Sequence, residues 1–250
     1  PGTVNEKKAL NGLSVTLEDG DFVTIVGSNG AGKSTLFNAV AGDFYPDQGS
    51  IRLDSRNITY LPAYRRSRQI GRLFQDPMRG TAPHMTIEEN LALAAGSGGW
   101  FSPMTKADRK RFQDRLALLD MGLEDRMRQP VGLLSGGQRK ALTLLMATMN
   151  PPKLLLLDEH TAALAPGTAE KVLKITRDVV AQHSITTLMV THNMKNALEL
   201  GNRTLMMDSG HIVLDVQGEE RAGMTVNDLL ERFRAGAGKD LDNDRILLSD

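Results

Sequence analysis

A glycine-rich run with a single lysine stands between an apolar segment and a helix-forming segment. Its residues are Gly27, Ser28, Asn29, Gly30, Ala31, Gly32, Lys33, Ser34 and Thr35. Glycines let a backbone wrap tightly enough for several N–H groups to face one anion, and the helix that follows adds its positive N-terminus. In such a loop the lysine reaches the β- and γ-phosphates, and the next serine binds Mg²⁺. The run therefore predicts a site for a nucleoside triphosphate with Mg²⁺, and by itself it fits kinases and GTPases equally well.

Two acidic residues follow an unbroken apolar run much later in the chain. Leu154–Leu157 is typical of a buried strand in a parallel sheet, and Asp158 and Glu159 come directly after it. One carboxylate at such a strand end can hold the shell of a Mg²⁺ ion. The other can polarise an attacking water, which contributes roughly 10²–10⁴-fold in rate. Together with the phosphate loop, the pair predicts nucleotide hydrolysis, with Asp158 on the metal and Glu159 on the water.

A third motif opens a helix with a second anion-binding end. Leu134 is followed by Ser135, Gly136, Gly137 and Gln138 and then by a helix-forming run. We refer to Leu134–Gln138 as the signature segment. A helix start attracts anions, and a protein seldom needs two such starts for one triphosphate. With these motifs the chain resembles, over nearly its whole length, the nucleotide-binding domain of ATP-binding cassette (ABC) proteins. The resemblance implies a head-to-tail dimer in which the signature segment of one subunit closes on the ATP of the other.

The resemblance assigns two more residues. Gln75, in Leu73-Phe-Gln-Asp-Pro77, resembles the family's glutamine loop, which binds Mg²⁺ and links the ATP site to a helical subdomain. His192 follows an apolar strand, as the family's γ-phosphate-sensing histidine does. The implied cofactors are ATP and Mg²⁺. The implied catalytic residues are Lys33, Glu159 and His192, and the implied metal ligands are Ser34, Gln75 and Asp158. The remaining histidines are expected to be exposed or packing residues: His84, His160, His183 and His211.

The chain departs from the family's pattern at three places. The family usually has proline where this chain has His160, and aspartate where it has Ala165. That aspartate makes hydrogen bonds across the dimer, so we expect weaker coupling between the two ATP sites. The family also stacks adenine on an aromatic residue before the phosphate loop. No aromatic residue precedes Phe22, so this platform is either missing or lies upstream of Pro1.

Hydrophobic periodicity and turn residues indicate alternating strands and helices. Thr86 is placed to begin a helix with a capping box, and Asp208-Ser-Gly is placed to turn a hairpin over 203–216. The expected strands are 22–26, 51–53, 58–60, 154–157 and 186–190, and the expected helices are 33–41, 106–119, 168–182, one ending at Gly201 and one starting near Thr225.

This alternation predicts an α/β fold: a P-loop nucleoside-triphosphatase core with a parallel central sheet, an antiparallel β region and an inserted α-helical subdomain. We expect one domain over 1–235, with its core in 1–75 and 151–216 and its helical subdomain at about 76–150. A flexible polar tail is expected over 236–250.

Composition narrows the function classes. The 30 basic and 30 acidic side chains cancel, which argues against a nucleic-acid partner. The absence of cysteine excludes disulfides and thiolate metal sites. No run approaches the ~20 apolar residues of a membrane span, so other chains must supply the membrane helices of a transporter. The expected partners are a second copy, transmembrane permease subunits and a periplasmic or lipoprotein substrate-binding protein, at the cytoplasmic face of a bacterial inner membrane.

Non-transport ABC ATPases are the competing hypothesis. Chromosome-type members insert a long coiled coil, but only about 100 residues separate Lys33 from Ser135, without sustained heptads. Translation-type members carry two cassettes, and repair members carry cysteine-rich zinc modules, so transport is favoured. The runs around the phosphate loop and Ile70-Gly-Arg-Leu-Phe-Gln resemble importers of branched-chain amino acids, and Leu157-Asp-Glu-His-Thr-Ala-Ala-Leu resembles a tryptophan or tyrosine uptake group. A lipid or lipoprotein exporter stays open.

Overall fold

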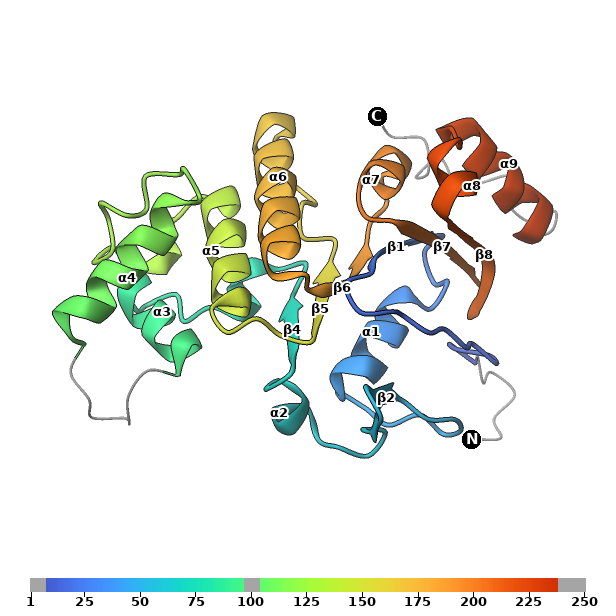
Figure 1. Ribbon diagram of the computed structural model, residues 1–250, viewed down its shortest axis with the longest axis horizontal. Helices are drawn as coiled ribbons and strands as arrows, with labels where there is room; N and C mark the ends of the chain where they lie inside the picture. The colour runs from blue at the N-terminus through green and yellow to red at the C-terminus, as the bar shows by residue number, and fades with distance from the viewer. Residues whose placement is uncertain (1–7, 97–103, 238–250) are drawn as a thin grey trace.

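The computed structural model describes residues 8–96 and 104–237 (Figure 1). Its strands are β1 Phe22–Gly27, β2 Arg52–Leu53, β3 Arg56–Asn57, β4 Ile70–Leu73, β5 Leu154–Asp158, β6 Thr186–Val190, β7 Arg203–Asp208 and β8 His211–Gln217. Its α-helices are α1 Lys33–Ala41, α2 Ala63–Arg66, α3 Ile87–Ala95, α4 Lys106–Ala117, α5 Gly136–Thr148, α6 Pro166–His183, α7 Met194–Glu199, α8 Gly218–Ala222 and α9 Val226–Ala237. Short 3₁₀ turns lie at Pro77–Gly80 and Val131–Leu133.

The main sheet has the strand order β4-β5-β6-β1-β7-β8. All neighbours in it run parallel except β8, which forms an antiparallel hairpin with β7. A separate small hairpin pairs β2 with β3. The parallel strands β1, β4, β5 and β6 therefore end at one edge of the sheet, where ligands of such folds bind. This arrangement confirms the predicted α/β class with its antiparallel region.

Buried side chains alternate between the two faces of the sheet. On β1, Val23 and Ile25 pack in one cluster with Phe37 of α1, whereas Val26 packs on the opposite face in a cluster with Met194 of α7 and Phe233 of α9. This period of two is what a strand covered on both sides requires. In Figure 1, α1 lies below the sheet and α6 and α7 lie above it.

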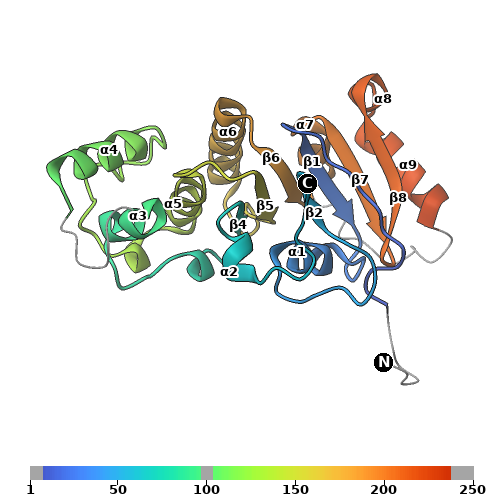
Figure 2. The ribbon, with the colours of Figure 1, turned by 60° about the horizontal axis from the view of Figure 1, so that its bottom comes forward.

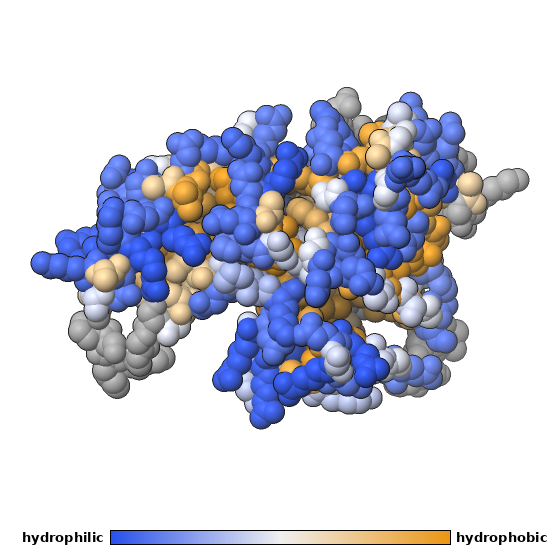
Figure 3. Space-filling view, in the orientation of Figure 1, coloured by the Kyte–Doolittle hydropathy of each residue, from blue (hydrophilic) through white to orange (hydrophobic). Residues whose placement is uncertain are grey.

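The inserted helices α3, α4 and α5 extend from the β4 edge of the sheet (Figures 1 and 2). Their apolar side chains share one buried cluster with β5 and α6, so the helical part is packed continuously onto the core. Thr86 caps α3 with a reciprocal capping box through Glu89, as predicted. Hydrophilic side chains cover most of the face seen in Figure 3.

The predicted strand at 58–60 is wrong. The hairpin turns through Asp54, whose φ is 51°, so Arg56 and Asn57 pair with Leu53 and Arg52 instead. The Asn57 side chain then accepts hydrogen bonds from both the N–H and the hydroxyl of Thr59. This local turn ends the strand before Ile58.

The last helix reaches the C-terminal end of the described residues. Thr225 and Asp228 form the expected reciprocal cap of the last helix. That helix, α9, continues through Ala237, so the first two residues of the predicted tail, 236 and 237, are helical. The rest of the predicted tail lies outside the described residues. Among the described residues, no helix is both long enough and apolar enough to cross a lipid bilayer.

Candidate nucleotide site

The phosphate loop joins β1 to α1, as the sequence predicts. Gly27, at the end of β1, has φ 148°, and a Cβ there would lie 2.1 Å from the carbonyl oxygen of Met207. Gly32 caps α1 with φ 99°, and a Cβ there would lie 2.5 Å from the carbonyl oxygen of Ala9. Glycine is therefore required at both ends of the loop by backbone conformation and by close packing.

Lys33 is 6% exposed and folds back onto the loop that precedes it. Its Nζ donates hydrogen bonds to the carbonyl oxygens of Gly27 at 2.5 Å and Ser28 at 2.9 Å. Ser34 follows on the first turn of α1 and is exposed. The first N–H groups of a helix have no partner within it, so the loop, the ammonium and the helix start together form a site for phosphate.

Asp158 ends β5, between β4 and β6. Burial raises the pKa of Asp158, and the positive charge of Arg72 is the largest opposing influence. The Arg72 guanidinium lies 4.0 Å from the Asp158 carboxylate. Lys33 and His192 also lower the pKa of Asp158 through their charge. A nearby cation favours the ionised form of such a half-buried carboxylate. A metal ligand needs this property.

Glu159 is contacted by side chains from two other strand ends. His192, after β6, donates from Nε2 to Oε1 at 2.5 Å, and Gln75, after β4, donates from Nε2 to Oε2 at 3.2 Å. The His192 hydrogen bond is the main cause that lowers the pKa of Glu159, against an opposing effect of burial. Glu159 is thus ionised at neutral pH and oriented through both of its oxygens.

The donor set around Asp158 fits Mg²⁺. Among the described residues, no group of three or more histidine, cysteine or acidic side chains could hold a metal by itself. Mg²⁺ is usually held by one or two carboxylates together with water and substrate phosphates. A hydroxyl from Ser34, an amide from Gln75 and a carboxylate from Asp158 are oxygen donors of this kind.

The signature segment does not join the phosphate loop within one chain. Ser135 caps α5, accepting from the N–H of Gln138 at 3.3 Å, while the Gln138 side chain accepts from the N–H of Ser135 at 3.2 Å. In Figures 1 and 2, α5 lies on the far side of β4 and β5 from α1. Within one chain, the signature segment at the start of α5 and the phosphate loop at the start of α1 thus belong to helices on opposite sides of these strands.

Residues 10–162 match the ABC transporter family. The tyrosine transport ATP-binding protein of Clostridioides difficile (strain R20291) is 45% identical over 236 residues, which cover 93% of this chain and 92% of that protein. The chain belongs to the ABC transporter family. The high-affinity branched-chain amino acid transport ATP-binding protein BraG of Pseudomonas aeruginosa is 34% identical and is matched over 84% of this chain and 87% of its own length.

Two solved structures support the same assignment. An ATP-binding cassette of an ABC transporter in its ADP conformation superposes with a TM-score of 0.76 at 29% identity, covering 93% of this chain and 94% of that one. A dimeric cassette in a post-hydrolysis state, bound to ADP and Pi, superposes with a TM-score of 0.73 at 26% identity, covering 87% and 94%. The chain is therefore an ABC ATPase, the ATP-hydrolysing component of its transporter.

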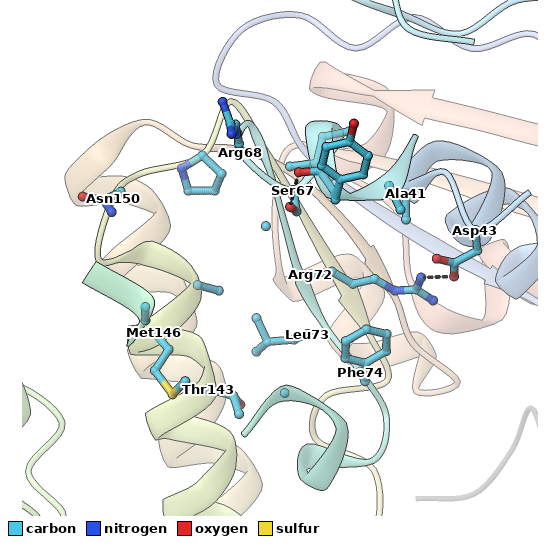
Figure 4. Close-up of a pocket in the computed structure, with 18 residues that line it drawn as sticks. Ala41, Asp43, Ser67, Arg68, Arg72, Leu73, Phe74, Thr143, Met146 and Asn150 are labelled. Carbon is cyan, nitrogen blue, oxygen red and sulfur yellow. Dashed lines mark hydrogen bonds and ion pairs between the residues drawn. The ribbon is translucent and has the colours of Figure 1, made fainter. Parts of the chain in front are cut away.

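A cavity of about 700 Å³ lies beside the ATP site of this ABC ATPase (Figure 4). Arg72 and Phe74 form one wall, and Thr143 and Met146 of α5 form the facing wall. The Arg72 guanidinium forms a salt bridge with the Asp43 carboxylate at 2.7 Å within this wall. It also lies 4.0 Å from the Asp158 carboxylate. Sequence reasoning gave Arg72 no role, although it stands two residues before the phenylalanine of the glutamine loop.

His160, where the family usually has proline, is a buried packing residue with 1% of its surface exposed. Its Nε2 lies 2.9 Å from the hydroxyl of Thr176, which donates its own proton to the carbonyl of Val172. Nε2 must therefore carry a proton and donate it to Thr176. Burial, reinforced by the charge of Lys140, lowers the pKa of His160 to about 3.

This burial predicts acid sensitivity. As the pH falls below the ordinary pKa of histidine, the unfolded chain takes up a proton at His160 while the folded chain does not, until about pH 3. The free energy of unfolding should then fall by up to about 1.4 kcal/mol per pH unit from this residue. Urea unfolding of His160→Gln between pH 7 and 4.5 should show a smaller loss than the wild type. His84→Gln, at an exposed position, is the control, and equal slopes for all three proteins would contradict the prediction.

Ala165, where the family usually has aspartate, caps α6 without a side-chain hydrogen bond. Its backbone already has the extended conformation of an N-cap residue, with φ −60° and ψ 145°. Ala165→Asp should therefore stabilise the protein by about 1 kcal/mol, a rise of about 2–4 °C in Tm. Ala165→Asn should match that rise, since it caps equally well, and an unchanged Tm in both variants would contradict the prediction. From the family resemblance, only the aspartate variant should increase ATPase cooperativity.

The expectation that the adenine platform is missing or lies upstream of Pro1 stays a prediction. Residues 1–7 lie outside the described residues, and the backbone of residues 9–11 lies against the phosphate loop: Asn11 donates to the carbonyl of Gly210, whose N–H donates to Ala31.

Proposed function

We propose that this chain binds MgATP on its phosphate loop and hydrolyses it in a head-to-tail homodimer that drives import of an amino acid. The observation that supports hydrolysis best is the convergence of Gln75, Glu159 and His192 from the ends of three neighbouring strands. A carboxylate held through both oxygens, next to a phosphate site, can accept a proton from an attacking water.

The other residues have roles that follow from their positions. Lys33 and the N–H groups of residues 27–35 hold the β- and γ-phosphates. Ser34, Gln75 and Asp158 hold Mg²⁺, which neutralises phosphate charge when it is bound. Ser135, Gly136, Gly137 and Gln138 complete the site of the partner copy.

The cargo is proposed from the relatives. The curated proteins described above carry tyrosine and branched-chain amino-acid transport in their names, at 45% and 34% identity. An aromatic or branched-chain amino acid is therefore the proposed cargo, delivered by a periplasmic or lipoprotein binding protein to permease subunits, with this chain at the cytoplasmic face of the membrane. These relatives favour import over a lipid or lipoprotein exporter and over a non-transport ATPase.

We further propose that a permease segment docks in the cavity beside the site. Its lining includes the apolar side chains of Leu73 and Met146, together with Tyr64 of α2 and Arg68 just after that helix. The cavity wall continues from Leu73 directly into the segment that carries Gln75, so a segment seated there could displace the Gln75 contact with Glu159. Because the chain has no cysteine, a single cysteine at Arg68 provides a clean crosslinking probe for this contact.

The function is tested with the gene's own transporter. Uptake of labelled tyrosine, tryptophan and leucine should fall in a deletion strain of the source organism and return with the wild-type gene. It should not return with Lys33→Ala. The proposal would be overturned if the deletion strain took up all three amino acids normally. It would also be overturned if the purified protein had no Mg²⁺-dependent ATPase activity.

A further inference from the structure

The turn that carries Glu159 is held in an unfavourable backbone conformation. We call residues 159–163 the Glu159 turn. Glu159 has φ 45° and Ala163 has φ 61°, both in the left-handed region. A side chain with a Cβ is crowded against the backbone in this region, so each such residue is held there at a cost in free energy. The turn can therefore keep this shape only where neighbouring elements fix it.

Three neighbouring elements supply that support. The carbonyl of Val190 on β6 accepts from the N–H of Glu159 at 3.1 Å. Thr176 on α6 binds His160. On the third side, Lys140 of α5 donates from Nζ to the carbonyl of Ala162 at 2.8 Å. The signature segment forms the start of α5, and Lys140 lies on this helix five residues after Ser135.

Lys140 is 4% exposed, which is a costly place for an ammonium group. An apolar side chain of similar size could fill the same space between α5 and the turn without that cost. Burial lowers the pKa of Lys140, while the carboxylates of Glu159 and Asp76 act against burial. The cation thus contacts the backbone of the Glu159 turn and also acts electrostatically on the Glu159 carboxylate.

We propose that Lys140 is a positioning residue that fixes the Glu159 turn to the signature helix. The inference rests on the proposed function, in which the signature segment contacts ATP bound by the partner copy. A shift of α5 at that contact then reaches Glu159 of the same subunit through the hydrogen bond from Lys140 to Ala162. Lys140 would provide a link between the two ATP sites in a chain whose Ala165 lacks the carboxylate that relatives use there.

The test compares Lys140→Met, which fills the space without a donor, with Lys140→Arg, which restores a cation. Lys140→Met should lower kcat about tenfold and leave the KM for ATP and the affinity for a fluorescent ATP analogue within about twofold. Lys140→Arg should recover most of kcat. Lys174→Met, at an exposed position on α6, is the control for loss of a lysine. If Lys140→Met does not fold, Lys140→Gln takes its place in the same comparison.

A double mutant separates positioning from general structural support. In single-turnover assays with labelled ATP, adding Lys140→Met to Glu159→Gln should cause no further loss, because the side chain that Lys140 positions is already inactive. The full tenfold loss in the double mutant, equal losses for the Met and Arg variants, or weakened ATP binding would overturn the inference. Failure of the proposed function would look different, since the wild-type chain itself would then lack MgATP hydrolysis.

Discussion

Replacing Glu159 with glutamine should lower the rate of ATP hydrolysis by about 10²–10⁴-fold, the contribution of a positioned general base. The amide has the same size and can still contact both His192 and Gln75, so the loop should keep its shape. Glu159 also raises the pKa of Asp158 through its negative charge. Removing that charge favours the ionised form of Asp158, so MgATP binding should not weaken.

Two measurements check this prediction. Phosphate release should fall while binding of a fluorescent ATP analogue stays within about twofold, and size-exclusion chromatography with light scattering should show a dimer in the presence of MgATP. Glu170→Gln, which removes an exposed carboxylate from α6, should hydrolyse ATP like the wild type. A Glu159→Gln protein that turns over at more than about a tenth of the wild-type rate, or stays monomeric with saturating ATP, would contradict the assignment of Glu159.

Replacing Gly137 with alanine should destabilise the protein and impair hydrolysis together. A Cβ at Gly137 would lie 2.2 Å from Cγ2 of Thr168 on α6, far inside van der Waals contact. Overpacking of this kind typically costs about 1–3 kcal/mol. Relief requires Thr168 to change its rotamer or α5 to move away from α6, and movement of α5 displaces the signature segment at its start.

The neighbouring glycine is the matched control. A Cβ at Gly136 would meet its nearest atom, in Leu164, at 3.5 Å, which is ordinary contact. Gly136→Ala should therefore be neutral or slightly stabilising, because alanine favours helices over glycine. Thr168→Ser removes Cγ2 and should restore the stability of Gly137→Ala in thermal unfolding. If Gly136→Ala and Gly137→Ala lose equal stability, the steric explanation is wrong.

The sequence places the motifs correctly among the strands and helices because each motif is contiguous. The phosphate loop, the Asp158–Glu159 pair and the signature segment each occupy one short run between recognisable elements, so their local geometry follows from local residues. Pairing of Glu159 with His192 is less evident in the sequence, since it depends on β5 and β6 being neighbours in the sheet. The family resemblance assigned His192 to the γ-phosphate and did not pair it with Glu159, so this contact comes from the structure.

Residues that act through distant contacts were missed. Lys140 lies in a segment whose sequence predicts a helix, where a lysine is an ordinary polar residue. Nothing nearby in the sequence indicates that its ammonium donates a hydrogen bond to Ala162. Arg72 lies in a short strand, and its contact with Asp158 arises only from the pairing of β4 with β5. The strand expected at 58–60 failed for a local reason, because the Asn57 side chain competes for the backbone N–H of Thr59.

The position of β1 in the sheet has a consequence for how the protein is made. β1 pairs with β6 and β7, whose residues are synthesised more than 160 positions later. Gly27 packs against Met207, and the carbonyl of Ala31 accepts from the N–H of Gly210. During translation the phosphate loop therefore leaves the ribosome early but gains its supporting strand last, after the helices α3 to α6 have been able to form from local contacts. A nascent chain that stops before β7 would carry every residue of the phosphate loop without the strand that shapes it.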